Sequence, residues 1–162
     1  MTIEPLKFAH WPEVKSIYEL GIASGQASFQ TTAPEWEEWN NSHIFKPRLV
    51  MMEGNKVLAW AALTPVSGRC VYAGVAEVSV YVDPQSQGKG IGRQILNQLI
   101  LESEQNGFWT LQAGIFPENA ASLKIHEQLG FRILGVREKI GMMNGVWRDT
   151  VFLERRSKIA GQ

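Results

Sequence analysis

The sequence predicts an α/β (α+β) fold built around a mixed β-sheet. Candidate strands and helices follow one another in the order β-α-α-β-β-β-α-β-α-β-β. Short turns between several candidate strands favour antiparallel pairing, whereas two strand–helix units in the second half require parallel crossovers. A sheet of this kind is stable when helices cover its faces. We therefore expect one domain over residues 1–162, with about seven strands and about four helices.

The first part of the chain predicts one strand and two helices. Ile3 to Phe8 is typical of a short strand. Proline suits the first turn of a helix, and apolar residues recur at helical spacing from Pro12 to Ala23. A loop over residues 25–34 follows, and we expect Pro34 to open a second helix that carries Trp36.

Three strands come next. Arg48 to Met52 and Lys56 to Leu63 predict a hairpin, because the residues between them are Glu-Gly-Asn. From Val71 to Val82 the residues are largely β-branched and alternate, and an Asp-Pro pair ends this strand.

The second half predicts helices that alternate with strands. An amphipathic helix begins after a glycine-rich stretch, and a later helix ends at Gly130, a residue type that commonly caps helices. The expected elements are a helix from Ile91 to about Asn106, a strand from Thr110 to Ile115, a helix from Asn119 to Leu129, and strands Phe131 to Ile140 and Val146 to Arg155 around the turn Asn144-Gly145.

The charge balance and cysteine content exclude several classes of protein. The chain has 16 Lys and Arg against 16 Asp and Glu, so its formal net charge is zero. Nucleic-acid and membrane-surface binders depend on a basic field, and we expect neither partner. The single cysteine, Cys70, excludes an internal disulfide, and no metal-ligand spacing appears. Without a leader-like or membrane-spanning apolar run, we expect a cytoplasmic protein.

Three glycines, Gly88, Gly90 and Gly92, stand between a strand and a helix. Exposed backbone N–H groups at such a turn, together with the helix dipole, form a site for phosphate. The spacing G-x-G-x-G differs from the dinucleotide fingerprint G-x-G-x-x-G, and Lys89 is followed by glycine rather than by the Ser or Thr of a P-loop. The alternative without a ligand is a glycine turn that only begins the helix.

The predicted helix from Asn119 to Leu129 places polar residues on its inner face. At ~100° per residue, Asn119, Ser122 and His126 fall among the apolar side chains, and the charged residues gather opposite them. Buried polar groups need hydrogen-bond partners. This stripe therefore either makes structural hydrogen bonds or lines a ligand cleft, and the glycine turn as a candidate neighbour favours the cleft.

Glu77 stands in the middle of an apolar strand, on the same face as Ser79 and Tyr81. A carboxylate in this place is either half of a structural ion pair with an arginine or a general base. An alkyl ammonium group titrates near ~10.4, so an amine that acts as a nucleophile at neutral pH must lose a proton. A carboxylate on this strand can accept that proton, directly or through water.

These residues resemble the motifs of the GCN5-related N-acetyltransferase (GNAT) superfamily. The turn Gln87-Gly88-Lys89-Gly90-Ile91-Gly92 matches the pattern Q/R-x-x-G-x-G/A. A second pattern of the superfamily, N-x-x-A/S-x-x-x-Y/H-x-x-x-G-F, is matched by Asn119, Ser122, His126, Gly130 and Phe131.

Three features resemble the phosphinothricin and methionine sulfone acetyltransferase branch of that superfamily. They are the histidine at the Tyr/His position, the strand sequence AEVSVYV at 76–82 and the segment ASFQTTAP at 27–34. The resemblance covers essentially the whole chain. It departs at Gln30, where the branch often has glutamate, and at 71–76, where several members carry arginine or tryptophan.

The resemblance implies a GNAT fold with splayed parallel strands 4 and 5, acetyl-CoA as co-substrate, and no metal. It implies that Glu77 is the general base and that His126 protonates the departing thiolate. The donor-binding residues implied are Val80, Tyr81, Val82, Gln87, Gly88, Lys89, Gly90, Ile91, Gly92, Asn119 and Ser122. The acceptor is expected against Phe29, Trp36, Arg69, Glu77 and Ser79. Among these, Arg69 would clamp a carboxylate with its guanidinium fork.

We expect an N-acetyltransferase that moves an acetyl group from acetyl-CoA to the primary amine of a small amino-acid-like acceptor, of the phosphinothricin or methionine sulfone/sulfoximine type. The amine would attack the thioester directly in a ternary complex, and backbone N–H groups of the central strand would stabilise the oxyanion. Two alternatives stay open. One is another acceptor (a polyamine, an aminoglycoside or a protein N-terminus), and the other is a CoA-responsive binding module without turnover. The branch commonly forms dimers, so we expect a homodimer.

Overall fold

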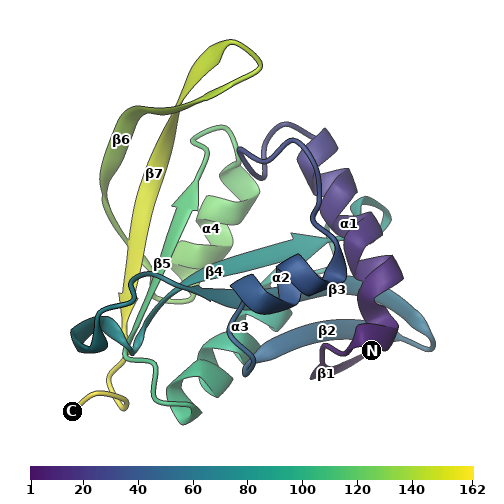
Figure 1. Ribbon diagram of the computed structural model, residues 1–162, viewed down its shortest axis with the longest axis horizontal. Helices are drawn as coiled ribbons and strands as arrows, with labels where there is room; N and C mark the ends of the chain where they lie inside the picture. Colours follow the sequence, from purple (N-terminus) through teal and green to yellow (C-terminus); the bar gives the residue numbers. More distant parts are fainter.

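The computed structural model describes all 162 residues and contains one seven-stranded sheet, in the order β1-β2-β3-β4-β5-β7-β6 (Figure 1). The strands are β1 (Thr2–Pro5), β2 (Arg48–Glu53), β3 (Lys56–Pro65), β4 (Val75–Val82), β5 (Thr110–Ile115), β6 (Arg132–Met143) and β7 (Val146–Arg156). The helices are α1 (Trp11–Ala23), α2 (Trp36–Ser42), α3 (Ile91–Gln105) and α4 (Ala120–Gln128), with short 3-10 turns η1 (Phe8–His10), η2 (Cys70–Tyr72) and η3 (Pro84–Ser86). The predicted mixed sheet of seven strands and four helices is confirmed.

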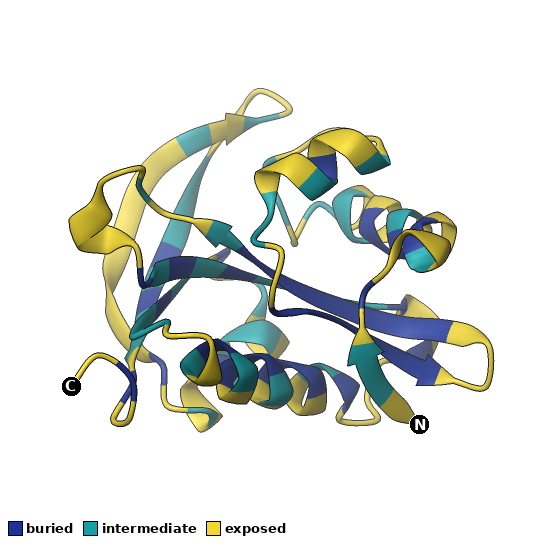
Figure 2. Cartoon of the chain, turned by 60° about the horizontal axis from the view of Figure 1, so that its bottom comes forward, coloured by how far each residue is buried: buried dark blue, intermediate teal, exposed yellow.

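Helices cover both faces of the sheet, with α1 and α2 on one side and α3 and α4 on the other (Figure 2). Side chains of β2 and β3 point alternately to the two faces of the sheet, and this alternation explains the arrangement. Val50 and Trp60 belong to the apolar cluster under α1 and α2, whereas their neighbours Leu49 and Ala61 belong to the cluster under α3. Because both faces are apolar, both need a covering layer. None of the helices is long and apolar enough to cross a membrane.

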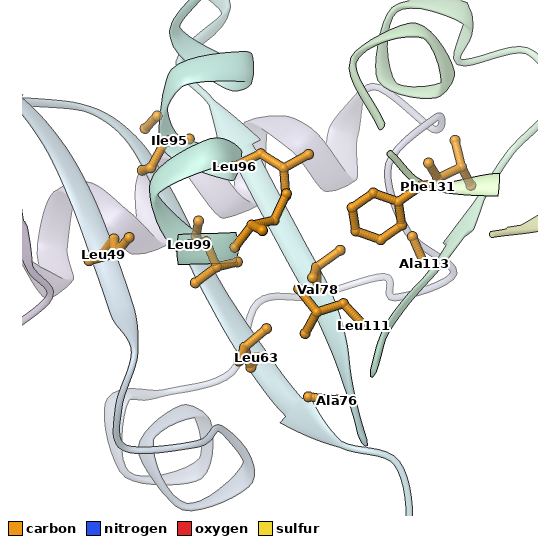
Figure 3. Packing of buried hydrophobic residues seen from close by; sticks show 14 of the residues in the cluster. Leu49, Leu63, Ala76, Val78, Ile95, Leu96, Leu99, Leu111, Ala113 and Phe131 are labelled. Carbon is orange, nitrogen blue, oxygen red and sulfur yellow. The ribbon is translucent and has the colours of Figure 1, made fainter. Parts of the chain in front are cut away.

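The larger core cluster holds α3 against the sheet (Figure 3). Leu96 and Leu99 of α3 are fully buried, and they share this cluster with Val78 of β4 and Leu111 of β5. Truncating a buried leucine to alanine costs about 2–5 kcal/mol of stability. This packing therefore fixes where the N-terminus of α3 lies relative to β4.

β4 and β5 pair in parallel over only three residue pairs, from Val75 with Thr110 to Glu77 with Gln112. Beyond that point β4 keeps its pairing with β3 as far as Val82, whereas β5 remains paired only with β7 on its other side. The two strands therefore separate after Glu77, and the edge of β4 that faces β5 has no strand partner there. The expected splay of strands 4 and 5 is confirmed.

Three predicted strand boundaries are wrong, and one of them is the end of β6, which continues to Met143 instead of stopping at Ile140. The strand expected from Val71 begins at Val75, because residues 70–72 form the turn η2 and the chain then passes under Trp109. A Cβ on Gly74 would lie 2.1 Å from the ring of Trp109, so glycine is required at this crossing. The first strand ends at Pro5 rather than Phe8, because the chain turns through η1 into α1.

Candidate active site

The separation of β4 and β5 opens into a cleft of about 430 Å³. Its walls come from β4, the end of β5, α4, the loop between α1 and α2, and the β6–β7 hairpin. Residues that the sequence predicted for the site and that line this cleft are Phe29, Glu77, Ser79, Val80, Tyr81, Asn119, Ser122 and His126. Three separate segments of the chain thus contribute predicted residues to one space. The structure contains no group of His, Cys, Asp and Glu side chains that could hold a metal ion.

Glu77 lies where the two parallel strands begin to separate. It is paired with Thr64 of β3 on one side and with Gln112 of β5 on the other, and this is the last parallel pair. The carboxylate lines the cleft and makes no salt bridge or hydrogen bond with the rest of the protein. The structural ion pair weighed from the sequence is absent, so the carboxylate is free to meet a ligand.

His126 is buried on the inner face of α4, as predicted, and only 4% of the residue is exposed. Its Nδ1 lies 2.7 Å from the carbonyl oxygen of Ser122, which can only accept a hydrogen bond, so Nδ1 carries a proton. Burial lowers the pKa of His126, although the bond to Ser122 acts in the opposite direction. The ring is therefore neutral near pH 7, and its Nε2 lone pair is the one that can face the cleft.

Asn119 begins α4 and also holds the wall of the cleft. Its Oδ1 accepts a hydrogen bond from the backbone N–H of Ser122 at 3.2 Å, a typical N-cap contact. Its Nδ2 donates to the carbonyl oxygen of Gln26 at 3.3 Å. The polar stripe predicted on this helix thus makes structural hydrogen bonds and lines the cleft at the same time.

Tyr81 closes the side of the cleft below α1. Its ring stacks on Trp60 at 4.8 Å and packs against Tyr18 at 4.9 Å between centroids. A Cβ on Gly21 of α1 would lie 2.6 Å from this ring, so the close approach of the helix requires glycine. Burial raises the pKa of Tyr81 far above its ordinary value, so the phenol stays neutral.

The glycine turn leads from β4 into α3. Gly88 and Gly90 have φ values of 79° and 74°, in the left-handed region that favours glycine. A Cβ on Gly92 would lie 3.3 Å from Ile125 of α4 and 3.4 Å from Val82 of β4, so this glycine lets the two helices and the strand meet. The turn is exposed, and the first turn of α3 carries no acidic residue. Backbone N–H groups at this helix start are open to an anion.

Some predicted residues lie elsewhere. Trp36 packs against Phe8 and Trp11 outside the cleft, and Arg69 lies on an exposed loop with its guanidinium 5.7 Å from the ring of Tyr72. The side chain of Ile91 is buried in the core. The remaining residues that were predicted to bind the donor lie at or beside the glycine turn; they are Val82, Gln87, Gly88, Lys89, Gly90 and Gly92.

The cleft also contains residues that the sequence did not suggest. These are Gly114 of β5, Phe116 just after β5, and Arg137, Ile140, Gly141 and Thr150 of the β6–β7 hairpin. Arg148 holds the adjacent loop, because its guanidinium donates to the carbonyl oxygen of Gly25 at 2.8 Å and to Gln26 at 2.9 Å. Local sequence patterns do not single out the six lining residues, since each reaches the cleft only through the way the last strands pair.

Known proteins match this chain in sequence and in fold. Residues 12–131 match the model of the Acetyltransferase (GNAT) family. An L-methionine sulfoximine/L-methionine sulfone acetyltransferase of Salmonella typhimurium is 36% identical over 67% of this chain, and the match spans 63% of that protein. A phosphinothricin N-acetyltransferase of Alcaligenes faecalis is 32% identical, over 95% of this chain and 81% of that protein. An acetyltransferase of Salmonella typhimurium, solved with its cofactor acetyl-CoA, superposes with a TM-score of 0.89 at 29% identity, covering 100% of this chain and 97% of that one. This protein belongs to the GNAT family of acetyltransferases.

Proposed function

We propose that this protein transfers an acetyl group from acetyl-CoA to the primary amine of a small amino-acid-like acceptor. The observation that carries the proposal is the cleft itself, in which a free carboxylate on β4 and a neutral imidazole on α4 line one space beside an open helix N-terminus. Membership of the GNAT family, and the names of the relatives, support the reaction and the kind of acceptor.

The glycine turn and the splayed strands fit acetyl-CoA. The pyrophosphate would lie on the backbone N–H groups of Gly88, Gly90 and Gly92, where a side chain would block the approach or strain the backbone. The pantetheine arm would pair with the unpartnered edge of β4 at Val80 to Val82 and pass Asn119 and Ser122. Acetyl-CoA supplies an acetyl thioester, whose carbonyl oxygen would develop negative charge beside backbone N–H groups of β4.

Two protons must leave the amine, and the cleft offers a group for each. Glu77 would take the first from the ammonium, directly or through water, and so release the nucleophilic lone pair. As the N–C bond forms, the nitrogen becomes positive, and Nε2 of His126 would take its second proton. His126 would then deliver that proton to the sulfur as the C–S bond breaks, leaving an amide and a free thiol. The imidazole is suited to this relay because it is neutral at rest.

The acceptor would enter from the side of the α1–α2 loop and the β6–β7 hairpin. Phe29 stands there at 4.9 Å from Phe116 in an edge-to-face contact, and Gly141 leaves room for its ring. The cleft volume of about 430 Å³ suits a small molecule. Methionine sulfone, methionine sulfoximine and phosphinothricin are therefore the first candidates. The homodimer and the cytoplasmic location stay predictions.

The test is release of free thiol from acetyl-CoA in the presence of a panel of amines. The panel contains these three amino acids, a polyamine, an aminoglycoside and a peptide with a free N-terminus. We expect turnover with the amino acids and a loss of about 100-fold or more in the Glu77→Gln protein. Glu127→Gln, on the exposed face of α4, is the matched control. A protein that binds acetyl-CoA but releases no thiol with any amine would be a binding module, and the proposal would be wrong.

A further inference from the structure

Only two of the 20 residues that line the cleft have side chains charged at neutral pH, and their charges are opposite. One is the carboxylate of Glu77. The other is the guanidinium of Arg137, which stands on β6 opposite Thr150 of β7. A cleft with one acid and one base is suited to a ligand that carries both charges.

The guanidinium of Arg137 is held in place but has no partner for its charge. It lies 4.1 Å from the ring centroid of Phe152, close enough for a cation–π contact. It makes no hydrogen bond or salt bridge with the protein. The five N–H donors of an arginine form a planar fork that matches a carboxylate, so this group can bind a second, anionic end of a ligand.

The sheet register places Arg137 within reach of an acceptor bound at Glu77. Glu77 pairs with Gln112, Gly114 lies two residues further along β5, and Gly114 pairs with Phe152. Phe152 is therefore two strands away from Glu77 across the sheet and two residues further along it. These two offsets put the backbones of Glu77 and Phe152 ~12 Å apart. Glu77 and Arg137 both line the cleft, and the guanidinium of Arg137 lies against the ring of Phe152, so the two charged groups face one space across this distance.

The part of the cleft between Glu77 and Arg137 is open. Gly114 lines the cleft, and a Cβ built on it would have no atom within 4 Å. This space can hold the body of an amino acid, with its ammonium toward Glu77 and its carboxylate toward Arg137.

Neither Arg148 nor Arg69 is available for this role. Arg148 already donates to Gly25, Gln26 and Glu118. Arg69, which the sequence suggested as the carboxylate clamp, does not line the cleft.

We propose that Arg137 binds the carboxylate of the acceptor and so determines its specificity for amino acids over simple amines. The proposal rests on the proposed acetyl transfer and adds the residue that recognises the second end of the acceptor. Phe152 positions the guanidinium, and Gly114 leaves the space between the two charged groups.

The test compares L-methionine sulfone with its decarboxylated amine analogue, in the wild-type protein and in Arg137→Leu. Leucine keeps apolar contact with Phe152 and removes the charge. We expect kcat/KM for methionine sulfone to fall about 10- to 100-fold, with little change for the analogue and for the Kd of acetyl-CoA. Arg137→Lys should restore part of the loss, because it keeps the charge without the fork. Arg132→Leu, on the same strand but outside the cleft, is the matched control and should behave like wild type.

An equal loss for both acceptors, or no loss for either, would overturn the assignment of Arg137. If no amine releases thiol, the proposed acetyl transfer fails, and calorimetry of methionine sulfone binding to the CoA-bound protein decides the subsite separately. Binding that weakens in Arg137→Leu but not in Arg132→Leu would support the anionic subsite. Binding that is absent, or equal in both variants, would exclude it.

Discussion

Nδ1 of His126 donates a hydrogen bond to the carbonyl oxygen of Ser122, one turn earlier on α4, at 2.7 Å. This bond settles which nitrogen is protonated, because a carbonyl cannot donate. It also orients the ring, so that Nε2 is the nitrogen left for chemistry. Burial lowers the pKa of the imidazole, so in the proposed reaction the ring would enter as an acceptor of protons rather than as a stored acid.

The first prediction concerns the pH dependence of His126. Because the pKa of His126 is lowered below its ordinary value, the relay should be active at neutral pH and should weaken as pH falls and Nε2 becomes protonated. We expect His126→Gln to lower kcat about 100-fold, to leave the Kd of acetyl-CoA nearly unchanged, and to lack this acid-side step. The measurement is kcat from pH 5 to 9 in both proteins. A step above pH 7 that disappears with His126 would show a ring that is protonated at rest, contrary to this prediction.

The second prediction concerns the donor site. Gly90→Glu should weaken acetyl-CoA binding at least tenfold, because it adds bulk and a negative charge where phosphate would lie. Gly107→Glu is the matched control, since Gly107 has a φ of 85° and lies just beyond the opposite end of α3. Both substitutions strain the backbone in the same way, so equal Kd values for acetyl-CoA in titration calorimetry would contradict the assignment of the turn.

The third prediction concerns the wall of the cleft. Arg148→Ala removes two hydrogen bonds to residues 25 and 26 and a guanidinium that lies 3.9 Å from the ring of Phe116. Charge-assisted bonds of this kind contribute about 1.5–3 kcal/mol each, so the loop should loosen. We expect the KM for the acceptor to rise about tenfold and the loop at 24–34 to be cleaved faster in limited proteolysis. Arg132→Ala should change neither, and the same result for Arg148→Ala would show that the loop is held by other contacts.

The fourth prediction concerns stability and His43. Burial lowers the pKa of His43 to about 4, with the nearby charge of Arg48 acting in the same direction and the bond to Trp39 opposing it. Between pH 4 and 6.5 the unfolded chain therefore binds more protons at this site than the folded one, so stability falls as pH decreases. The loss from His43 between pH 7 and pH 5 should be about 2 kcal/mol.

The measurement is the free energy of unfolding in urea, for the wild type and for His43→Phe, at pH 7 and at pH 5. Phenylalanine keeps the stacking on Trp39, where the rings lie 4.2 Å apart, but cannot titrate. The variant should therefore show a smaller pH dependence. Some dependence should remain, because the lowered pKa of His126 acts in the same direction. Identical pH dependence in both proteins would show that His43 is not protonated on unfolding.

Much of the secondary structure was predictable because its causes are local. The strand Thr110–Ile115 has the predicted bounds. The Asn144-Gly145 turn has φ values of 52° and 77°, which those two residue types adopt more readily than others. The start of β4 was not predictable, because β propensity at Val71 yields to the packing of Trp109 on Gly74.

The residues of the candidate site were also predictable only in part. Periodicity placed His126 and Ser122 on the inner face of α4 and Glu77 on one face of β4, and all three line the cleft. The same patterns could not place Arg69, because an exposed loop carries no periodic signal. They also could not find Arg137, because β6 is exposed along most of its length and has no clear buried face.

The order of the elements, the inward stripe of α4 and the glycine turn all follow from residues that are neighbours along the chain, through backbone sterics and the periods of helix and strand. The cleft does not, because it exists where β4 and β5 cease to pair and where β7 and β6 extend the sheet in the order β5-β7-β6. That order brings Arg137 into the cleft that holds Glu77, although the two are 60 positions apart in the sequence. Such contacts are set by strand register and by the packing of a whole sheet, which no local pattern encodes.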